Sequence, residues 1–316
     1  MAAYLVTGGA GFIGSHLVEE LVRRGERVRV VDSLITGKRS NLAHVESAIE
    51  FMEGDLAIAD VARQAVVGMG YVLHQAAIPS VPRSVTDPVT SHRANLNGTL
   101  NVLVAARDAG VKRLVFAGSS SVYGNAAALP KHEDMPTRPL SPYALQKLAG
   151  EQYCQLFTAL YGFETVTTRY FNVFGPRQDP SSPYSGVISL FIRALVEGRS
   201  PTIYDDGEQT RDFTYVSNVV DGVLRACQAT GVAGTVINVA TGGRISLNRL
   251  YQVLKALTGS SMEPSYGSPR AGDVRDSQAD ISRARQLLGY TPVVGLEEGL
   301  TTTLAWYRSD LPSTNP

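Results

Sequence analysis

Short apolar runs alternate with longer amphipathic stretches along the first half of the chain. The apolar runs read AYLVTG, RVRVVD, IEFMEGD, YVLHQAA and RLVFAGS. Runs of this length are typical of buried strands, whereas the stretches between them carry the spacing of helices. Strands that alternate with helices build βαβ units. The pattern therefore predicts a parallel sheet with helices packed on its faces.

Three of the predicted helices bear on function. The first spans about residues 12–24, and two longer ones span about 87–109 and 142–162. The alternation ends with the strand ETVTTRYFNVFG, and the next segment, GPRQDPSSPYSG, is rich in proline, glycine and serine. This composition predicts a loop, and shorter elements follow it. We expect a second, smaller α/β lobe over the carboxyl edge of the sheet.

The predicted domain boundary follows from the end of the alternation. Residues 1–172 form the sheet domain, to which a segment near 212–242 returns. Residues 173–211 and 243–316 form the substrate lobe.

Composition narrows the classes of partner. The 316 residues contain 29 Lys plus Arg and 29 Asp plus Glu, so no net field attracts nucleic acid or an anionic membrane. We expect small-molecule partners. The cysteines are Cys154 and Cys227, and no apolar run approaches the roughly 20 residues of a membrane span. The N-terminus enters a strand without a signal peptide, which favours a cytoplasmic location.

A glycine-rich turn, TGGAGFIG, joins the first strand to the first helix. Gly8, Gly11 and Gly14 allow a tight turn, a close approach of the backbone to a pyrophosphate, and close packing of helix on strand. The helix N-terminus adds unpaired N–H donors for the anion. The same residues could also serve as a plain strand-to-helix turn. Their context favours a Rossmann-type, doubly wound fold that binds a dinucleotide.

Two aspartates refine the prediction of the cofactor. Asp32 ends the second strand, 18 residues beyond Gly14, where a carboxylate can accept hydrogen bonds from the ribose hydroxyls and repel a 2′-phosphate. NAD is therefore favoured over NADP. Asp55 follows the third strand, where it fits either a contact to the adenine edge or the cap of a loop.

The segment SPYALQK places Tyr143 and Lys147 on one face of a helix. A tyrosine with a pKa near 10 is a poor base at neutral pH. A lysine ammonium about 4 Å away could contribute roughly 4 kcal/mol, enough to lower the tyrosine pKa by about three units, and oxidised nicotinamide would add a second cation. Together they could make Tyr143 a phenolate. We expect Tyr143 to exchange a proton with a sugar hydroxyl. A solvated helix face is the alternative interpretation, but GSSSVYG at 118–124 brings hydroxyl groups to the same edge of the sheet.

Two histidines, His74 and His132, are candidate metal ligands by residue type. His74 and His132 lack partners at ligand spacing, so we interpret them as structural or solvent-facing and predict no metal site.

The sequence resembles the extended short-chain dehydrogenase/reductase family, and within it the nucleotide-sugar 4-epimerases. The resemblance covers nearly the whole chain. It rests on TGGAGFIG, VVDSL, GDL, HQAA, NLNGTLNVL, SSSVYG, SPYALQK, RYFNVFG, RDFTYV and GDVRDSQAD. It implies a catalytic triad of Ser119, Tyr143 and Lys147. The residues that it implies along the NAD cleft are Gly8, Gly11, Phe12, Ile13, Gly14, Asp32, Ser33, Asp55, Leu56, Ala76, Ala77, Asn95, Tyr143, Lys147 and Tyr170.

The resemblance also implies a site for a UDP-sugar. Arg211 and Arg270 would pair with the diphosphate, and Asp273 with the uridine ribose. The full set implied around the substrate is Ser80, Arg83, Ser121, Asn172, Arg211, Arg270, Asp273 and Ser277. A homodimer through the helices near 87–109 and 142–162 is implied as well.

The resemblance also predicts the reaction. Related dehydratases and decarboxylases carry an acidic residue before the Val-Tyr-Gly, where this chain has Ser120 and Ser121. Without this acidic residue, the resemblance implies neither dehydration nor decarboxylation. It implies 4-epimerisation, in which C4 is oxidised, the sugar rotates and the hydride returns to the other face. Ser277 stands at a position where, by the resemblance, epimerases restricted to unsubstituted hexoses carry a tyrosine. A serine there leaves room for an N-acetyl group, unless neighbouring residues close that space.

We therefore expect interconversion of UDP-GlcNAc and UDP-GalNAc, as in the UDP-N-acetylglucosamine 4-epimerases of bacterial surface-polysaccharide pathways. We also expect activity on UDP-Glc and UDP-Gal. A UDP-glucuronate 4-epimerase is the alternative within the family, although Asn172 and Asp179 fit a substrate carboxylate poorly. A non-catalytic NAD-binding sensor or scaffold is the alternative of another class.

Overall fold

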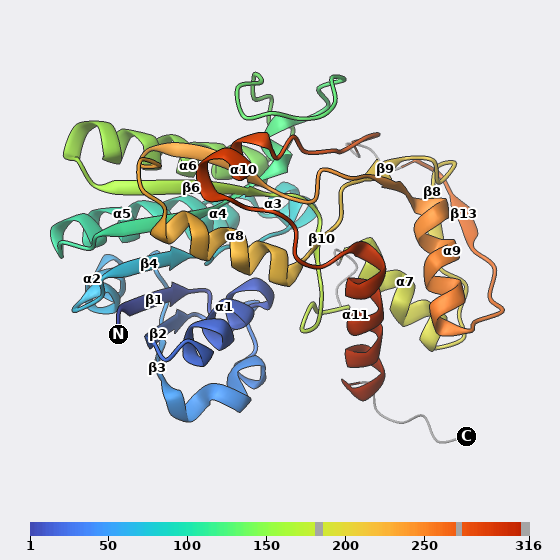
Figure 1. The fold of residues 1–316 in the computed structure, drawn as a ribbon, viewed down its shortest axis with the longest axis horizontal. Coiled ribbons are helices and arrows are strands. Elements are labelled where there is room, and N and C mark those ends of the chain that lie inside the picture. Colours follow the sequence, from blue (N-terminus) through green and yellow to red (C-terminus); the bar gives the residue numbers. More distant parts are fainter. Residues whose placement is uncertain (181–185, 270–273, 311–316) are drawn as a thin grey trace.

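A seven-stranded parallel sheet forms the centre of the protein. The computed structural model describes residues 1–180, 186–269 and 274–310. The strand order is β11-β6-β5-β4-β1-β2-β3, and all six neighbouring pairs run parallel. Helices cover both faces of this sheet (Figure 1). The predicted doubly wound α/β fold is confirmed.

The elements of this sheet follow the predicted apolar runs closely. Its strands are β1 (Ala3–Thr7), β2 (Arg27–Asp32), β3 (Ile49–Glu53), β4 (Tyr71–His74), β5 (Arg113–Ser119), β6 (Glu164–Tyr170) and β11 (Thr235–Val239). One face carries α1 (Phe12–Arg23) and α8 (Val216–Gln228), and the other carries α2 (Ala59–Val66), α5 (Gly98–Asp108) and α6 (Pro142–Tyr161).

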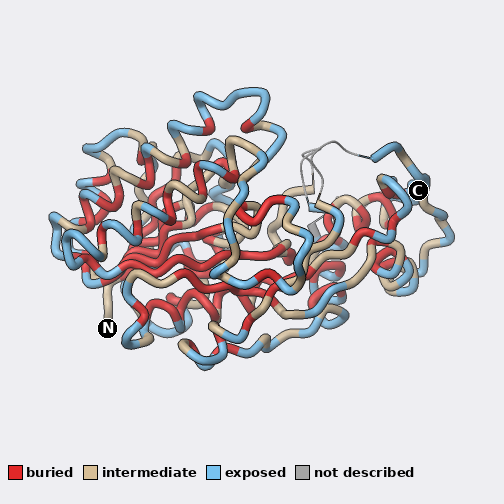
Figure 2. The backbone as a smooth tube through the Cα atoms, turned by 90° about the horizontal axis from the view of Figure 1, so that it is seen from above, coloured by how far each residue is buried: buried red, intermediate tan, exposed pale blue. Residues whose placement is uncertain are grey.

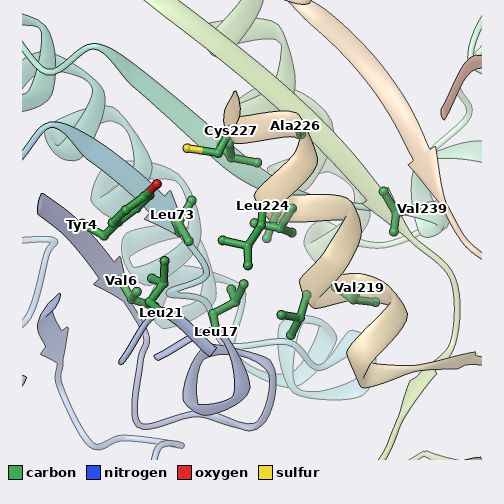
Figure 3. Packing of buried hydrophobic residues seen from close by; sticks show 14 of the residues in the cluster. Tyr4, Val6, Leu17, Leu21, Leu73, Val219, Leu224, Ala226, Cys227 and Val239 are labelled. Carbon is green, nitrogen blue, oxygen red and sulfur yellow. The ribbon is translucent and has the colours of Figure 1, made fainter. Parts of the chain in front are cut away.

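Both faces of the sheet are buried, which explains why its strands are continuously apolar in sequence. Tyr4 and Val6 of β1 pack with Leu17 of α1 and Val219 of α8 (Figure 3). Leu5, which lies between them in the chain, belongs to the cluster on the opposite face. Figure 2 shows the strands as a buried layer between more exposed helices.

The predicted helix over 87–109 consists of three consecutive pieces. They are α4 (Pro88–His92), a π-helical turn η2 (Arg93–Asn97) and α5. Apolar periodicity cannot reveal one extra residue in a turn. Helix α6 agrees with its prediction: Ser141 caps it by accepting a hydrogen bond from the Ala144 N–H at 3.2 Å, and it ends before Gly162, which has a φ of +65°.

Shorter elements follow β6 and form a second hydrophobic core. They are β7 (Val173–Phe174), α7 (Val187–Val196), β8 (Thr202–Tyr204), β9 (Thr210–Arg211), β10 (Thr214–Tyr215), β12 (Ile245–Ser246), α9 (Leu247–Thr258), β13 (Ser265–Gly267) and α11 (Leu296–Asp310). Helix α10 (Ser282–Leu288) instead packs on β11 and α8. The predicted division at residue 172 remains a proposal. Within residues 1–180, 186–269 and 274–310, the helices are too short or too polar to cross a bilayer.

A buried ion pair joins α6 to the sheet. Arg169 of β6 donates to both carboxylate oxygens of Glu151 of α6, at 2.9 and 2.6 Å, and the two side chains are 3% and 5% exposed. The Arg169 guanidinium also lies 4.7 Å from the centre of the Tyr123 ring. This pair holds the middle of α6 against the strand that borders the functional cleft.

Replacing Glu151 by Leu should destabilise the protein strongly, because Arg169 would remain buried without its carboxylate. We expect the free energy of unfolding to fall by about 3–5 kcal/mol in urea titrations. Glu46→Leu is the control, since it removes the exposed Arg39–Glu46 pair and should cost less than about 1 kcal/mol. Equal losses in the two variants would contradict the role of this pair.

Candidate active site

A cleft of about 1100 Å³ opens at the carboxyl ends of the central strands. In sheets of this topology ligands bind where the strand order reverses, here beside β1 and β4. Nearly all the residues predicted for the site line this cleft. They are Gly8, Gly11, Phe12, Ile13, Gly14, Asp32, Ser33, Asp55, Leu56, Ala76, Ala77, Ser80, Arg83, Ser119, Ser121, Tyr143, Lys147, Tyr170, Asn172, Arg211 and Ser277. Arg270 and Asp273 lie outside the described residues.

The glycine-rich turn has the shape that a pyrophosphate requires. A Cβ atom on Gly14 would lie 2.1 Å from the Gly8 carbonyl oxygen, and Gly8 itself has a φ of +65°. Gly11 is the N-cap of α1 and supplies no side-chain cap, so the first N–H groups of the helix stay available to an anion. These residues fit the dinucleotide that the sequence predicts.

Asp32 presents a fixed carboxylate beside the turn. It accepts hydrogen bonds from the Ala10 N–H at 3.0 Å and the Leu34 N–H at 2.8 Å, and it lines the cleft. Burial raises the pKa of this carboxyl above its ordinary value. A Cβ atom on Gly37 would lie 2.8 Å from the carboxylate oxygens, so any larger residue at this position would displace the Asp32 carboxylate or its own backbone. The site suits the two ribose hydroxyls of NAD.

Asp55 has local partners. Its carboxylate accepts from the Ala57 N–H at 2.9 Å and pairs with Arg93 at 2.8 Å. These contacts correspond to the loop-capping interpretation, while the residue still borders the cleft.

Ser119, Tyr143 and Lys147 converge on one part of the cleft. Ser119 is the last residue of β5, and its Oγ lies 2.9 Å from the Oγ of Ser121; its hydroxyl also lowers the pKa of Tyr143. Tyr143 stands in the first turn of α6, where its N–H donates to Ser84 Oγ at 3.1 Å. Lys147 follows one turn later and is 5% exposed.

The electrostatics of the tyrosine differ from the prediction. Burial raises the pKa of Tyr143 to about 12, and the hydrogen bond with Ser119 opposes this increase only in part. The predicted lowering by Lys147 does not appear, because desolvation of the phenol dominates and the Lys147 ammonium is directed to the Ala117 carbonyl oxygen at 2.8 Å. Burial lowers the pKa of Lys147 to about 8, so the side chain is still mainly charged at neutral pH.

A chain of buried hydrogen bonds connects β1 to α6; we call it the buried network. The ring of His74 lies between Thr7 Oγ1 at 2.7 Å and Thr99 Oγ1 at 2.9 Å. Thr99 donates to the Asn95 carbonyl at 2.6 Å, and the Asn95 amide donates to Gln146 Oε1 at 2.8 Å. Burial, aided by the charge of Lys147, lowers the pKa of His74 to about 3. His74 is therefore a neutral structural histidine, as predicted.

Asn95 lies behind the wall of the cleft, although the sequence placed it beside the cofactor. It is 3% exposed, and its Oδ1 accepts from the Ile78 N–H at 2.7 Å while its amide is directed to Gln146. Its contacts therefore fix the segment after β4. His132 is exposed, and no cluster of metal-ligating side chains occurs among the described residues.

Among the residues that line the cleft and were not predicted, three carry polar groups that bear on the site. Gln75 accepts from the Tyr170 hydroxyl at 3.1 Å, and its Nε2 has no partner among the described residues. It stands in the HQAA motif and could have been found there. Lys131 is 2% exposed and donates to the Ala126 carbonyl. Arg177 follows β7. Both of these arrive through loops, whose paths carry no local sequence signal.

A second cavity of about 580 Å³ adjoins the cleft in the smaller lobe. Both are lined by Asn172, Gln178 and Arg211. Arg211 donates to the carbonyl oxygens of Thr210 at 2.9 Å and Arg275 at 3.1 Å. A ligand could thus extend from the cleft into the smaller lobe past a guanidinium group.

Residues 4–240 match the model of the NAD dependent epimerase/dehydratase family. The chain belongs to this family. The prediction of an NAD-dependent enzyme of the nucleotide-sugar 4-epimerase group within the extended short-chain dehydrogenases/reductases is confirmed, and so is the prediction of the cofactor.

Relatives match the chain over nearly its whole length. It is 41% identical to the UDP-glucose 4-epimerase of Mycolicibacterium smegmatis, over 96% of this chain and 98% of that protein. It is similar to the solved UDP-N-acetylglucosamine 4-epimerase from Methanobrevibacter ruminantium M1 in complex with UDP-N-acetylmuramic acid, with 38% identity, coverage of 98% and 99%, and a TM-score of 0.94. It is also similar to MoeE5 in complex with UDP-glucuronic acid and NAD, with 38% identity, coverage of 98% and 100%, and a TM-score of 0.89.

Proposed function

We propose that the protein is a 4-epimerase that interconverts UDP-GlcNAc and UDP-GalNAc, and also UDP-Glc and UDP-Gal, through a transient 4-keto sugar. The observation that carries this proposal is the convergence of Ser119, Tyr143 and Lys147 in the same cleft as the glycine-rich turn. The family membership and this intact trio favour an enzyme over a sensor or scaffold.

Each residue of the trio has a distinct task in this proposal. NAD, when bound, supplies the acceptor for the hydride of sugar C4 and, in its oxidised form, a positive charge. Tyr143 exchanges the proton of the C4 hydroxyl, and Ser119 holds the phenol and the sugar oxygen in position through its hydroxyl. Because burial holds the Tyr143 pKa at about 12, the phenol needs added positive charge to give up its proton. Oxidised NAD would add this charge beside the buried ammonium of Lys147, whose own effect on the phenol is outweighed by burial.

The neighbourhood of the trio supports epimerisation over elimination or decarboxylation. Ser120 and Ser121 occupy the positions after Ser119 and line the cleft. Hydroxyl groups at neutral pH do not serve as the acid that loss of water requires. Oxidation and reduction at the same carbon therefore form the reaction that these side chains support.

The second cavity is the place that we propose for the nucleotide. Arg211 borders both cavities, so its guanidinium can neutralise a diphosphate that connects a sugar in the cleft to a uridine in the smaller lobe. Arg270 and Asp273 stay in the proposal from the sequence.

The proposed choice of sugar depends on Ser277. Its N–H donates to the Thr210 carbonyl at 3.0 Å, and this bond fixes its backbone at the wall of the cleft. Its short side chain leaves space that an N-acetyl group can occupy. Ser80, by contrast, accepts from the Arg83 N–H at 3.2 Å and caps the helix α3 (Val81–Thr86), so it shapes the wall as well as facing the sugar.

A UDP-glucuronate 4-epimerase is the second candidate, and Lys131 is the observation that favours it. This buried cation lines the cleft and could meet a carboxylate. The charge of Asp179, which seemed to oppose a uronate, is balanced by Lys38 at 2.9 Å. MoeE5 was solved with UDP-glucuronic acid. Ser277, which leaves room for an acetamide, favours the acetylated sugars.

We also propose a homodimer through α5 and α6. Val104 of α5 and Leu145, Leu156 and Leu160 of α6 are exposed apolar side chains. A second copy packed on these helices would bury them in a four-helix bundle. A monomer mass by light scattering at micromolar concentration would contradict this arrangement.

Replacing Tyr143 by Phe should abolish epimerisation and leave NAD bound. The change removes one phenolic oxygen and keeps the ring on its helix. We expect a loss of at least about 100-fold in kcat, measured by product formation, with unchanged NAD content of the purified protein. Turnover near that of the parent would exclude Tyr143 as the proton-transfer group.

Replacing Ser277 by Tyr should remove activity on UDP-GlcNAc and UDP-GalNAc while activity on UDP-Glc and UDP-Gal remains. A tyrosine fills the space proposed for the acetamide, and such packing differences change specificity by about 10–200-fold. All four sugars should be assayed beside UDP-GlcA, with Ser277→Ala as the small-residue control. If Ser277→Tyr leaves the ratio of the two pairs unaltered, the sugar is not selected at this residue. Preferred turnover of UDP-GlcA by the parent would support the second candidate instead.

A further inference from the structure

Residues 175–180 leave β7 and cross to the sheet domain; we call this segment the strap. Its root lies in the smaller lobe, where Ser189 donates to Gln178 Oε1 at 2.9 Å and Tyr307 of α11 donates to the Gln178 carbonyl. Arg177 has a φ of +67°, a region that side chains other than glycine rarely adopt. Such a conformation persists where surrounding contacts enforce it.

The Arg177 side chain fastens the strap to the sheet domain. Its guanidinium, 11% exposed, donates to His16 Nδ1 at 2.6 Å and pairs with Glu19 of α1 at 2.5 Å. It also donates to the Asn41 carbonyl at 3.3 Å in η1 (Arg39–Ala48). Residues about 140 to 160 positions apart in the chain are joined by this one side chain.

His16 strengthens the same attachment. Its Nε2 lies 3.0 Å from the Pro176 carbonyl oxygen, while Nδ1 faces Arg177. A neutral ring with its proton on Nε2 satisfies both contacts, since it donates to the carbonyl and accepts from the guanidinium. Burial, followed by the charge of Arg177, lowers the pKa of His16 to about 4, so the ring stays neutral at physiological pH.

A second attachment lies on the other side of the strap. Lys38 pairs with Asp179 at 2.9 Å, and both side chains are partly exposed. The Lys38 N–H donates to the Ala10 carbonyl at 2.9 Å, and the Asn41 amide donates to the same oxygen at 2.9 Å. Ala10 belongs to the glycine-rich turn, so the strap is fastened to the segment that supports this turn.

The strap and the turn both border the cleft. Gly11 and Phe12 of the turn and its helix line it, and so do Arg177, Gln178 and Asp179 of the strap. A dinucleotide whose pyrophosphate occupies the turn therefore lies beside the strap, between the two domains.

We propose that the strap retains NAD in the cleft, and that the Arg177 and Lys38–Asp179 attachments set the rate at which the cofactor leaves. The inference rests on the cofactor and not on the choice of sugar. Retention of NAD also suits the proposed reaction, because an epimerase regenerates its cofactor in each turnover and does not need to exchange it.

The test measures release of a fluorescent cofactor from the full-length protein. The protein is loaded with 1,N6-etheno-NAD and mixed with excess NAD, and the fluorescence change gives the dissociation rate. We expect release about tenfold faster in Arg177→Met and about two- to fivefold faster in Asp179→Asn, because both open the strap more often. The readout contains no sugar, so it is independent of the proposed reaction.

Matched variants separate the strap from a general loss of stability. Glu46→Gln neutralises a carboxylate of an exposed pair on η1 that does not reach the strap, and its release rate should equal that of the parent. Lys38→Gln removes the same ion pair from its other partner, and its release rate should rise as in Asp179→Asn. If Arg177→Met fails to fold, Asp179→Asn and Lys38→Gln decide.

Release within twofold of the parent rate in both Arg177→Met and Asp179→Asn would overturn the proposal. Equal acceleration by Glu46→Gln would overturn it as well, because the effect would then be unspecific.

Discussion

The buried network holds helix α6 in a fixed position against the sheet. Thr7 of β1, His74 of β4, Thr99 of α5, Asn95 of η2 and Gln146 of α6 are joined by successive hydrogen bonds. Gln146 precedes Lys147 in the chain, so the network ends beside the trio. Leaving any member unpaired in this interior would cost the desolvation of a polar group. The network therefore fixes α6 relative to the strand that leads into the glycine-rich turn.

The polar groups around the trio are already held in place by hydrogen bonds, which suits the proposed proton transfer. Lys147 is directed to the Ala117 carbonyl and Ser119 to Ser121, so these groups are in place before a substrate arrives. Preorganised donors stabilise developing charge without having to reorient, which is a major source of catalysis. The high pKa of Tyr143 has the same origin, because the burial that orders the site also disfavours a phenolate.

The sequence predicted the parts of this site whose geometry is local. Spacing within one element was enough to predict the glycine-rich turn, Asp32 at the end of β2, and the shared helix face of Tyr143 and Lys147. Asn95 lies next to the cleft and binds the Ile78 N–H and Gln146, contacts across the chain that no local pattern encodes. Lys131 and Arg177 reach the cleft through tertiary contacts that no local pattern encodes. Burial, which depends on the whole fold, raises the Tyr143 pKa more than Lys147 lowers it, so the predicted phenolate depends on the added charge of oxidised NAD.

The central claim is that hydrogen leaves C4 of the sugar and returns to the same carbon in one closed site. The most direct measurement uses UDP-GlcNAc deuterated at C4, with the rate and the label of the UDP-GalNAc product followed by NMR. The account predicts slower turnover of the deuterated sugar and full retention of deuterium at C4 in the inverted product. Loss of the deuterium from C4 to solvent would contradict the account, and so would such a loss together with a turnover rate equal to that of the unlabelled sugar.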